Sequence, residues 1–228
     1  MNLSCRLASA AILLAGSLPV LAGEAADTFN KIYGEDLQRV AATPSPADDV
    51  ALAKQMLEDA KKVGDHPLFL ALLCEKAYEL AARDASEYAT AKAAMDLLAE
   101  KVPEKKVECL QKNAVLYQRQ YATARGEART KAGEEVITAL SALAEAEAAA
   151  GDSDAAATTL RQAIAVATAI RSENKAVLQA QLENLVSRQK VEKQMAALKA
   201  KLDADPKDAA TRAELVRLYL VELDLREN

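Results

Sequence analysis

The sequence has no tryptophan and only two phenylalanines, and aromatic residues make up 4% of its 228 residues. Hydrophobic residues still account for 51% of the chain, and many of them are alanine. Alanine has the highest helix propensity but buries little area per residue. The scarcity of aromatic residues excludes a thick aromatic core, and the abundance of alanine predicts thin layers of closely packed helices.

The sequence also lacks the residues that most catalytic and nucleic-acid-binding sites need. His66 is the only histidine, and a lone imidazole cannot form a metal site or a proton relay without partners. We interpret it as a surface or capping residue. A glycine-rich phosphate loop and a nucleophile-elbow serine are both missing. The net charge of −5 argues against nucleic acid, because phosphate binding needs a basic face. We therefore expect no enzyme activity, cofactor, metal or nucleic acid.

Residues 1–23 have the pattern of a secretory signal peptide. Arg6 precedes an apolar run from Leu7 to Leu21, and small residues lead to an expected cleavage near Gly23. The apolar run is shorter than the roughly 20 residues that a membrane span needs. We expect a periplasmic or secreted protein without stable membrane insertion after cleavage, with an uncleaved anchor as the alternative.

Cys74 and Cys109 are the cysteines that remain after signal cleavage. Their separation is close to one period of a helical repeat, which would place them at similar positions in successive units. Equivalent points on stacked helices are about 8–10 Å apart, whereas the α-carbons of a disulfide lie within about 7 Å. We favour two buried thiols that act as small hydrophobic residues, and a disulfide in an oxidising compartment is the alternative.

Apolar residues recur at helical spacing along the chain, and no segment alternates convincingly with period two. The sequence therefore predicts an all-α fold of antiparallel helical hairpins stacked as a repeat array. We divide it into the signal peptide (1–23), a short leading helix and linker (24–45), degenerate helical repeats (46–125), a helical hairpin plus a long helix (126–203), and the first half of a further repeat (204–228).

Several local patterns refine this division. The leading helix carries apolar residues from Phe29 to Val40 and is interrupted by Gly34. Ser45 is expected to cap the next helix, with Pro46 at its first position. The helix that follows has an apolar stripe widened by Leu70, Leu73 and Cys74, which predicts burial on two sides.

Two further patterns concern the second half of the chain. Gly126 and Gly133 mark a weak point but not a clear domain boundary, because the flanking residues still favour helix. Residues 172–203 form a predicted helix of about 30 residues, roughly 45 Å long. Its apolar stripe shifts between Leu185 and Val191, so packing against neighbouring helices is favoured over a long two-stranded coiled coil.

Residues 136–168 and 204–224 carry the pattern of the tetratricopeptide repeat, which has two antiparallel helices and a period of 34 residues. In the second segment, Pro206 closes one unit, and Leu215 and Tyr219 occupy large positions of the next first helix. In the first segment, the small and large positions are Leu140, Leu143, Ala144, Gly151, Asp152, Ala156, Leu160 and Ala163.

On these residues the chain resembles a divergent tetratricopeptide-repeat protein. The order of its segments looks like the amino-terminal part of long secreted bacterial repeat proteins of unassigned function. The usual tryptophan is absent, and Glu147 stands where an aromatic residue is common.

The resemblance implies a concave groove, formed by the first helix of each repeat, that binds an extended peptide or a partner helix. The corresponding positions are Ser141 and Glu145 in the middle unit, and Ala213, Arg217 and Leu220 in the last unit. These residues form no paired basic clamp for a terminal carboxylate.

The last helix is expected to carry an apolar patch that includes Tyr219 and Leu223. Without a covering helix, such a patch must be covered by something else. We therefore expect a protein or peptide partner for this chain, with self-association through the last helix as a further prediction.

Three functions follow from these observations. The leading hypothesis is an exported, non-enzymatic helical-repeat scaffold for protein–protein contacts, which predicts a mixed groove on the first helices. The second is a structural spacer, or the amino-terminal portion of a larger exported protein whose active domain lies elsewhere, which predicts a bland surface. The third is a small exported hydrolase, which predicts a deep pocket with acids such as Asp84, Glu87 and Asp96.

Overall fold

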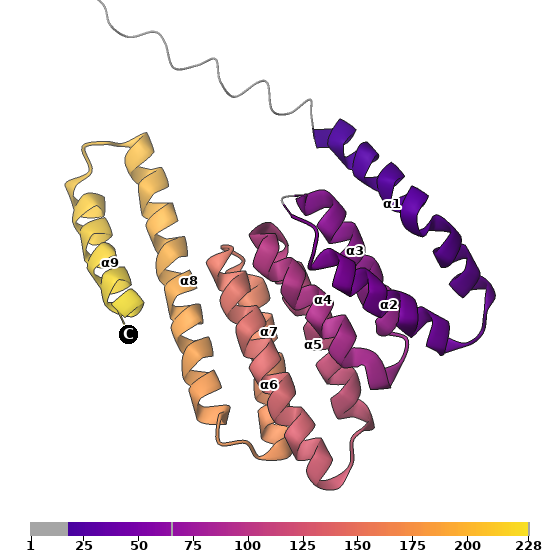
Figure 1. The fold of residues 1–228 in the computed structure, drawn as a ribbon. Helices are drawn as coiled ribbons and strands as arrows, with labels where there is room; N and C mark the ends of the chain where they lie inside the picture. Colours follow the sequence, from indigo (N-terminus) through magenta and orange to yellow (C-terminus); the bar gives the residue numbers. More distant parts are fainter. Residues whose placement is uncertain (1–17, 65, 228) are drawn as a thin grey trace, which may run out of the picture. The chain divides into compact units, whose positions relative to one another are not determined.

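The computed structural model describes residues 18–64 and 66–227, with side chains for 23–64 and 66–220. Within these residues the chain is helical and contains no strand, and helices that follow each other in sequence pack side by side (Figure 1). The predicted all-α array of stacked helices is confirmed. Its elements are α1 (Leu18–Ala42), α2 (Pro46–Ala60), α3 (Pro67–Ala81), η1 (Ala85–Glu87), α4 (Tyr88–Lys101), η2 (Pro103–Lys105), α5 (Lys106–Thr123), α6 (Gly126–Ala149), α7 (Ser153–Ile170), α8 (Lys175–Ala204) and α9 (Ala209–Glu227).

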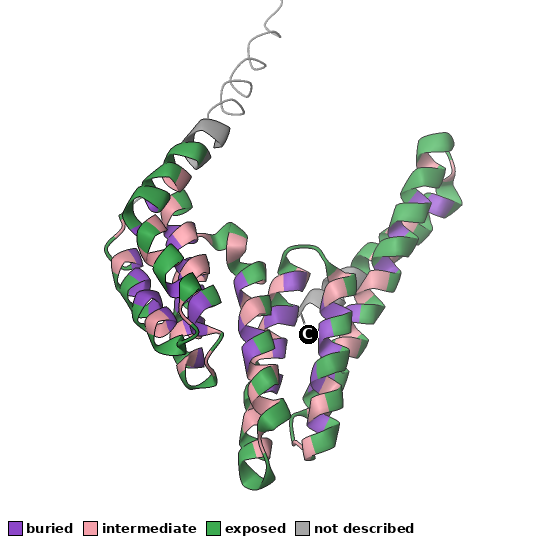
Figure 2. Ribbon diagram, turned by 90° about the vertical axis from the view of Figure 1, so that its right-hand side faces the viewer, coloured by how far each residue is buried: buried purple, intermediate pink, exposed green. Residues whose placement is uncertain are grey.

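The chain divides into two compact units, the first ending at Leu116 and the second beginning at Tyr117. The division falls inside α5, so this helix contributes its first residues to one unit and its last residues to the other. In both units, the helices bury the faces that meet their neighbours and expose the others (Figure 2). Each unit is described separately below.

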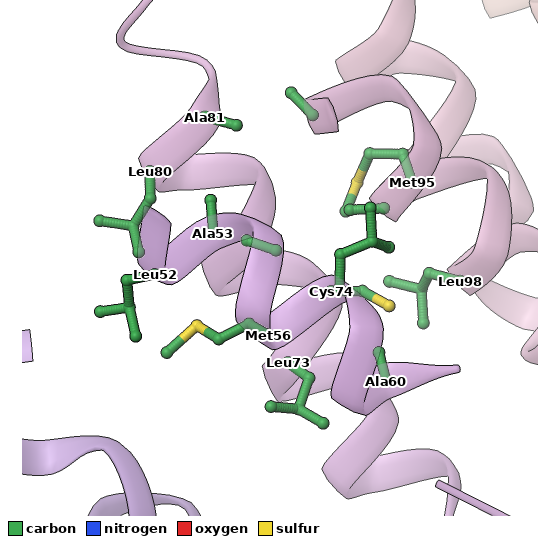
Figure 3. Close-up of a cluster of buried hydrophobic side chains, with 14 of the residues drawn as sticks. Leu52, Ala53, Met56, Ala60, Leu73, Cys74, Leu80, Ala81, Met95 and Leu98 are labelled. Atoms are coloured by element: carbon green, nitrogen blue, oxygen red, sulfur yellow. The ribbon is translucent and has the colours of Figure 1, made fainter. Parts of the chain in front are cut away.

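Helix α3 lies among α1, α2 and α4 in the first unit and packs against each of them. This arrangement explains why its apolar stripe covers more than one face. Leu73, Cys74 and Ala77 are fully buried, and the first two lie in the hydrophobic cluster shown in Figure 3. The prediction that this helix is buried on two sides is confirmed.

Helix α1 is longer than the sequence predicts and runs without interruption through Gly34. Its packing against the neighbouring helices offsets the weak helix propensity of glycine. Phe29 and Tyr33 are buried, and the Tyr33 hydroxyl donates a hydrogen bond to Asp59 Oδ2 at 2.8 Å. The ring of Phe29 meets Phe69 edge-on, with ring centroids 6.3 Å apart. Residues 1–17 of the expected signal peptide lie outside the described residues.

Helix α2 begins at Pro46, as predicted, and the Ser45 side chain accepts a hydrogen bond from the Ala47 amide at 3.4 Å. The buried Asp49 of its first turn accepts hydrogen bonds from Arg83 at 3.0 and 3.1 Å. This ion pair joins the start of α2 to the segment after α3. It is a long-range contact that local sequence patterns do not predict.

Helices α6 and α7 form an antiparallel hairpin in the second unit (Figure 1). The turn uses Gly151, whose φ of 86° favours a residue without a side chain, and Asp152, which accepts a hydrogen bond from the Ala155 amide at 2.9 Å. The repeat-pattern positions on the two helices are buried: Leu140, Leu143, Ala144, Ala156, Leu160 and Ala163. The pattern therefore marks the contact between these helices.

A buried polar pair lies inside the same hairpin. Glu147 is 4% exposed and Thr159 is 6% exposed, and the Thr159 hydroxyl donates a hydrogen bond to Glu147 Oε2 at 2.7 Å. A buried carboxylate needs such partners, because desolvation without hydrogen bonds is costly. Position 147, where the repeat pattern commonly has an aromatic residue, thus contributes a hydrogen bond instead of ring packing.

Helix α8 spans 30 residues, which confirms the predicted long helix. It packs against α7 on one side and α9 on the other (Figure 1). Its buried residues are Leu178, Leu185, Val191, Met195 and Leu198. The predicted shift of the apolar stripe between 185 and 191 accompanies packing against two different helices.

The break between α5, which ends at Thr123, and α6 lies immediately before Gly126, where the sequence predicts a weak point, and no break lies at Gly133. Gly126, with a φ of 57°, is the first residue of α6, and Gly133 lies within that helix. A Cβ atom at position 133 would lie 2.9 Å from both Cδ1 and Cγ2 of Ile170. Gly133 therefore permits a close approach between α6 and the end of α7.

Candidate functional site

A groove of about 350 Å³ lies between α6 and α8 in the second unit. We call it the α6/α8 groove. Its walls are the two helices that pack against α7. The groove is lined by Ile137, Thr138, Ser141, Ala142, Glu145, Asn174, Val177, Leu178 and Gln181.

The α6 wall presents a polar stripe. Thr138, Ser141 and Glu145 are three and four residues apart, so they lie on one face of the helix. Ile137 is buried next to this stripe because the helix turns its apolar side toward its neighbours. The wall therefore offers hydroxyl groups and one carboxylate above an apolar base.

The α8 wall combines exposed amides with an exposed apolar residue. Asn174 Nδ2 donates a hydrogen bond to Glu134 Oε2 at 3.1 Å, which ties the start of α8 to α6. Val177 is 58% exposed, whereas the adjacent Leu178 is buried. Gln181 continues the wall one turn beyond Val177. The result is a mixed surface that can make hydrogen bonds and apolar contacts.

The structure places the two groove positions of the middle unit, Ser141 and Glu145, together in the α6/α8 groove. Sequence reasoning missed the opposite wall, formed by Asn174, Val177 and Gln181. The repeat pattern gives no signal for these residues, because the long helix does not follow the usual repeat length. Helical spacing alone could have grouped them on one face.

The positions predicted on the last helix form a second, separate surface. Ala213, Arg217 and Leu220 are exposed on α9, and none of them lines the α6/α8 groove. Tyr219 is 41% exposed, and Lys199 Nζ lies 5.3 Å from the centre of its ring. The side chain of Leu223 lies outside the described residues. Partner binding by this helix stays a prediction.

A larger hollow of about 650 Å³ lies in the first unit, between α1 and residues 62–69. Apolar side chains such as Ile32, Leu68 and Phe69 line most of it. His66 also borders this hollow; it is the residue before α3, and its side chain makes no capping hydrogen bond. Lys62 at the rim pairs with Asp59 at 3.2 Å. The sequence did not predict this hollow, because the exposure of Ile32 depends on how α1 packs.

The three acids considered for a hydrolase have separate local partners. Asp84 accepts a hydrogen bond from the Ser86 amide at 2.9 Å, and Glu87 pairs with Lys54 at 2.7 Å. Asp96 accepts a hydrogen bond from Asn113 at 2.8 Å, and burial raises the pKa of its carboxyl group. Among the described residues, no group of three or more histidines, cysteines or acids is placed to hold a metal ion.

Basic residues at the junction of α5 and α6 serve the local structure. Arg125 donates hydrogen bonds to the carbonyl oxygens of Ala122 and Ala124, at 3.1 and 2.9 Å. Arg129 donates one to the carbonyl oxygen of Tyr121 at 3.1 Å and lies 4.1 Å from the centre of its ring. Cations at a helix C-terminus interact favourably with its unpaired carbonyl groups. These arginines therefore complete the end of α5.

Cys74 and Cys109 are buried free thiols in the first unit. Burial raises the pKa of Cys74 to about 12, with a further contribution from the nearby Cys109. Burial also raises the pKa of Cys109 to about 11. Both groups therefore favour the neutral thiol in the folded protein, and both lack the thiolate character that reactive cysteines need.

This state of the cysteines makes two measurable predictions. A thiol reagent at about pH 8 should label neither cysteine in the folded protein, and should label both after unfolding in guanidinium without reductant.

The pKa values of both thiols in the folded protein lie above the unfolded value of about 9.0. The contribution of the neutral thiols to the free energy of unfolding is therefore complete below that pH. It is lost as the pH rises toward about 11 and 12. The melting temperature should therefore fall over this range, and Cys74→Ala should reduce the fall. An unfolded chain without reactive thiols would contradict the free-thiol arrangement.

Comparison with protein-family models, curated proteins and solved structures finds no match. Among the helices of the described residues, none combines the length and the apolar character of a membrane span. The stacked helices define a helical-repeat-like fold. The candidate site is identified from its geometry and residue chemistry.

Proposed function

We propose that this chain is an exported, non-enzymatic helical-repeat scaffold, related to the tetratricopeptide-repeat proteins, that binds a protein or peptide partner in the α6/α8 groove. One observation carries this proposal: Ser141 and Glu145, the positions implied by the resemblance, both line the groove between α6 and α8. A preformed helical surface binds a partner segment with little ordering cost.

Hydrogen bonds in the first unit support the repeat relationship. Arg83 binds Asp49, and the Tyr78 hydroxyl donates to the Lys112 carbonyl oxygen at 3.1 Å; both pairs are separated by 34 residues. This separation equals the period of the tetratricopeptide repeat. The Tyr78–Lys112 bond joins the alternate helices α3 and α5, as expected of adjacent repeats, whereas Arg83 follows α3 and its bond to Asp49 joins the start of α2 to the end of the same hairpin.

The chemistry of the groove favours a peptide over a small substrate. Ser141 and Gln181 offer donors and acceptors for a peptide backbone, and Val177 offers an apolar contact. Thr138 offers only an acceptor oxygen, because its hydroxyl donates to the Glu134 carbonyl oxygen at 3.0 Å. The groove is a surface channel along two helices, and the acids considered for hydrolysis do not line it. Export rests on the amino-terminal sequence pattern.

The proposal can be tested by filling the groove. Peptides would first be selected from a random displayed library against the full chain, and their affinities measured by fluorescence anisotropy. Ser141→Trp should weaken binding by roughly tenfold or more, because the indole occupies the space of the partner. Ser187→Trp is the matched control, since Ser187 is exposed on α8 and does not line the groove. Equal binding to both variants would place the partner site elsewhere.

A further inference from the structure

The α6/α8 groove carries a single charge, and that charge is negative. Glu145 is the only charged residue among those that line it, and its side chain is exposed. It forms no ion pair with any residue whose side chain the structure describes. Glu134 lies on the same face of α6, about three turns earlier, and binds Asn174 at that end. The one charge in the groove lining is therefore negative.

An apolar surface lies on the opposite wall. Val177 is 58% exposed, and the adjacent Leu178 is buried. A partner side chain that covered Val177 would remove apolar area from water, which is worth roughly 25 cal/mol per Å². The groove thus offers one carboxylate and one apolar contact, with the polar groups of Ser141 and Gln181 as further lining.

The absence of cations from the groove lining also restricts the ligand. No lysine or arginine lines the groove, so a terminal carboxylate would find no charge partner there. A lysine or arginine side chain would instead meet Glu145, and its aliphatic stem would suit a groove with an apolar base. These features favour an internal segment of a partner over its free carboxyl end.

We propose that the α6/α8 groove selects partner segments in which a lysine or arginine lies close to an apolar residue, with the cation at Glu145 and the apolar side chain over Val177. This inference rests on the proposed function, because it names the partner chemistry of the same groove. The proposed ligand of the groove is therefore a basic amphipathic peptide segment.

The test uses the peptides selected on the full chain that lose binding in Ser141→Trp. These peptides should be enriched in lysine and arginine, and Glu145→Gln should weaken them about threefold, the size expected for a partly exposed ion pair. Glu135→Gln is the matched control, because Glu135 is exposed on the same helix outside the groove. Affinity should fall with added salt for the wild type, and this dependence should be smaller in Glu145→Gln.

A double-mutant cycle separates a direct ion pair from a general charge effect. Replacing the basic residue of the peptide with glutamine should weaken binding to the wild type and add little further loss in Glu145→Gln. Groove-bound peptides that carry no basic residue, or that bind Glu145→Gln with unchanged affinity, would overturn the inference. The proposed function of the groove as a peptide-binding site would not be affected. If no selected peptide is sensitive to Ser141→Trp, the proposed function fails, and the inference fails with it.

Discussion

Leu73→Ala should destabilise the protein by about 3 kcal/mol, one of the two largest effects that we expect. Leu73 is fully buried in α3, a helix that packs against α1, α2 and α4. Truncation removes the buried atoms and leaves a cavity that helices on several sides cannot close together. The free energy of unfolding can be measured by guanidinium denaturation followed by far-ultraviolet circular dichroism.

Leu68→Ala provides the matched control on the same helix. Leu68 is 39% exposed, so its truncation should cost less than about 1 kcal/mol. Both changes replace leucine with alanine within α3, and their effects on helix propensity nearly cancel in the comparison. Equal losses for the two variants would show that α3 is not packed as the structure describes.

Gly133→Leu should destabilise the second unit by about 2 kcal/mol, despite the better helix propensity of leucine. A Cβ atom at this position would lie 2.9 Å from two carbon atoms of Ile170 and 3.2 Å from Cε2 of Tyr121. The larger side chain must therefore displace the end of α7 or shift these neighbours. Thermal and guanidinium unfolding would both report the loss.

Gly34→Leu tests the same substitution where there is room. A Cβ atom at position 34 would have no heavy atom within 4 Å beyond its own helix and chain neighbours. This variant should therefore gain up to about 0.8 kcal/mol from helix propensity. Combining Gly133→Leu with Ile170→Ala should cost less than the sum of the two single changes, because the alanine removes the atoms that clash. Additive losses would argue against this steric explanation.

The features that could be predicted from the sequence are local ones. Helix positions follow from apolar spacing, and the start of α2 follows from Ser45 and Pro46, because capping chemistry acts within a few residues. The long α8 and its stripe shift were also visible, since burial against different neighbours changes the apolar face. In the candidate site, the repeat pattern pointed to Ser141 and Glu145, which line the α6 wall.

The features that could not be predicted depend on which helices meet. Gly133 was grouped with Gly126 as a weak point, because the sequence does not show that Ile170 approaches it from the end of α7. The burial of Asp49 against Arg83 likewise depends on how the helices pack. The α8 wall of the groove, including Val177, was missed for the same reason. Residue spacing identifies a helix face but not the helix that faces it.

The buried pair of Glu147 and Thr159 has a consequence for how the α6–α7 hairpin assembles. If α7 slid by about one turn along α6, the residue opposite Glu147 would become Ala155 or Ala163. Neither has a hydroxyl group, so the carboxylate would lose the hydrogen bond from Thr159 while remaining enclosed by apolar side chains. The hydrogen bond of 2.7 Å therefore adds a polar preference for one register to the apolar contacts of the hairpin, among them the close approach of Ile170 to Gly133.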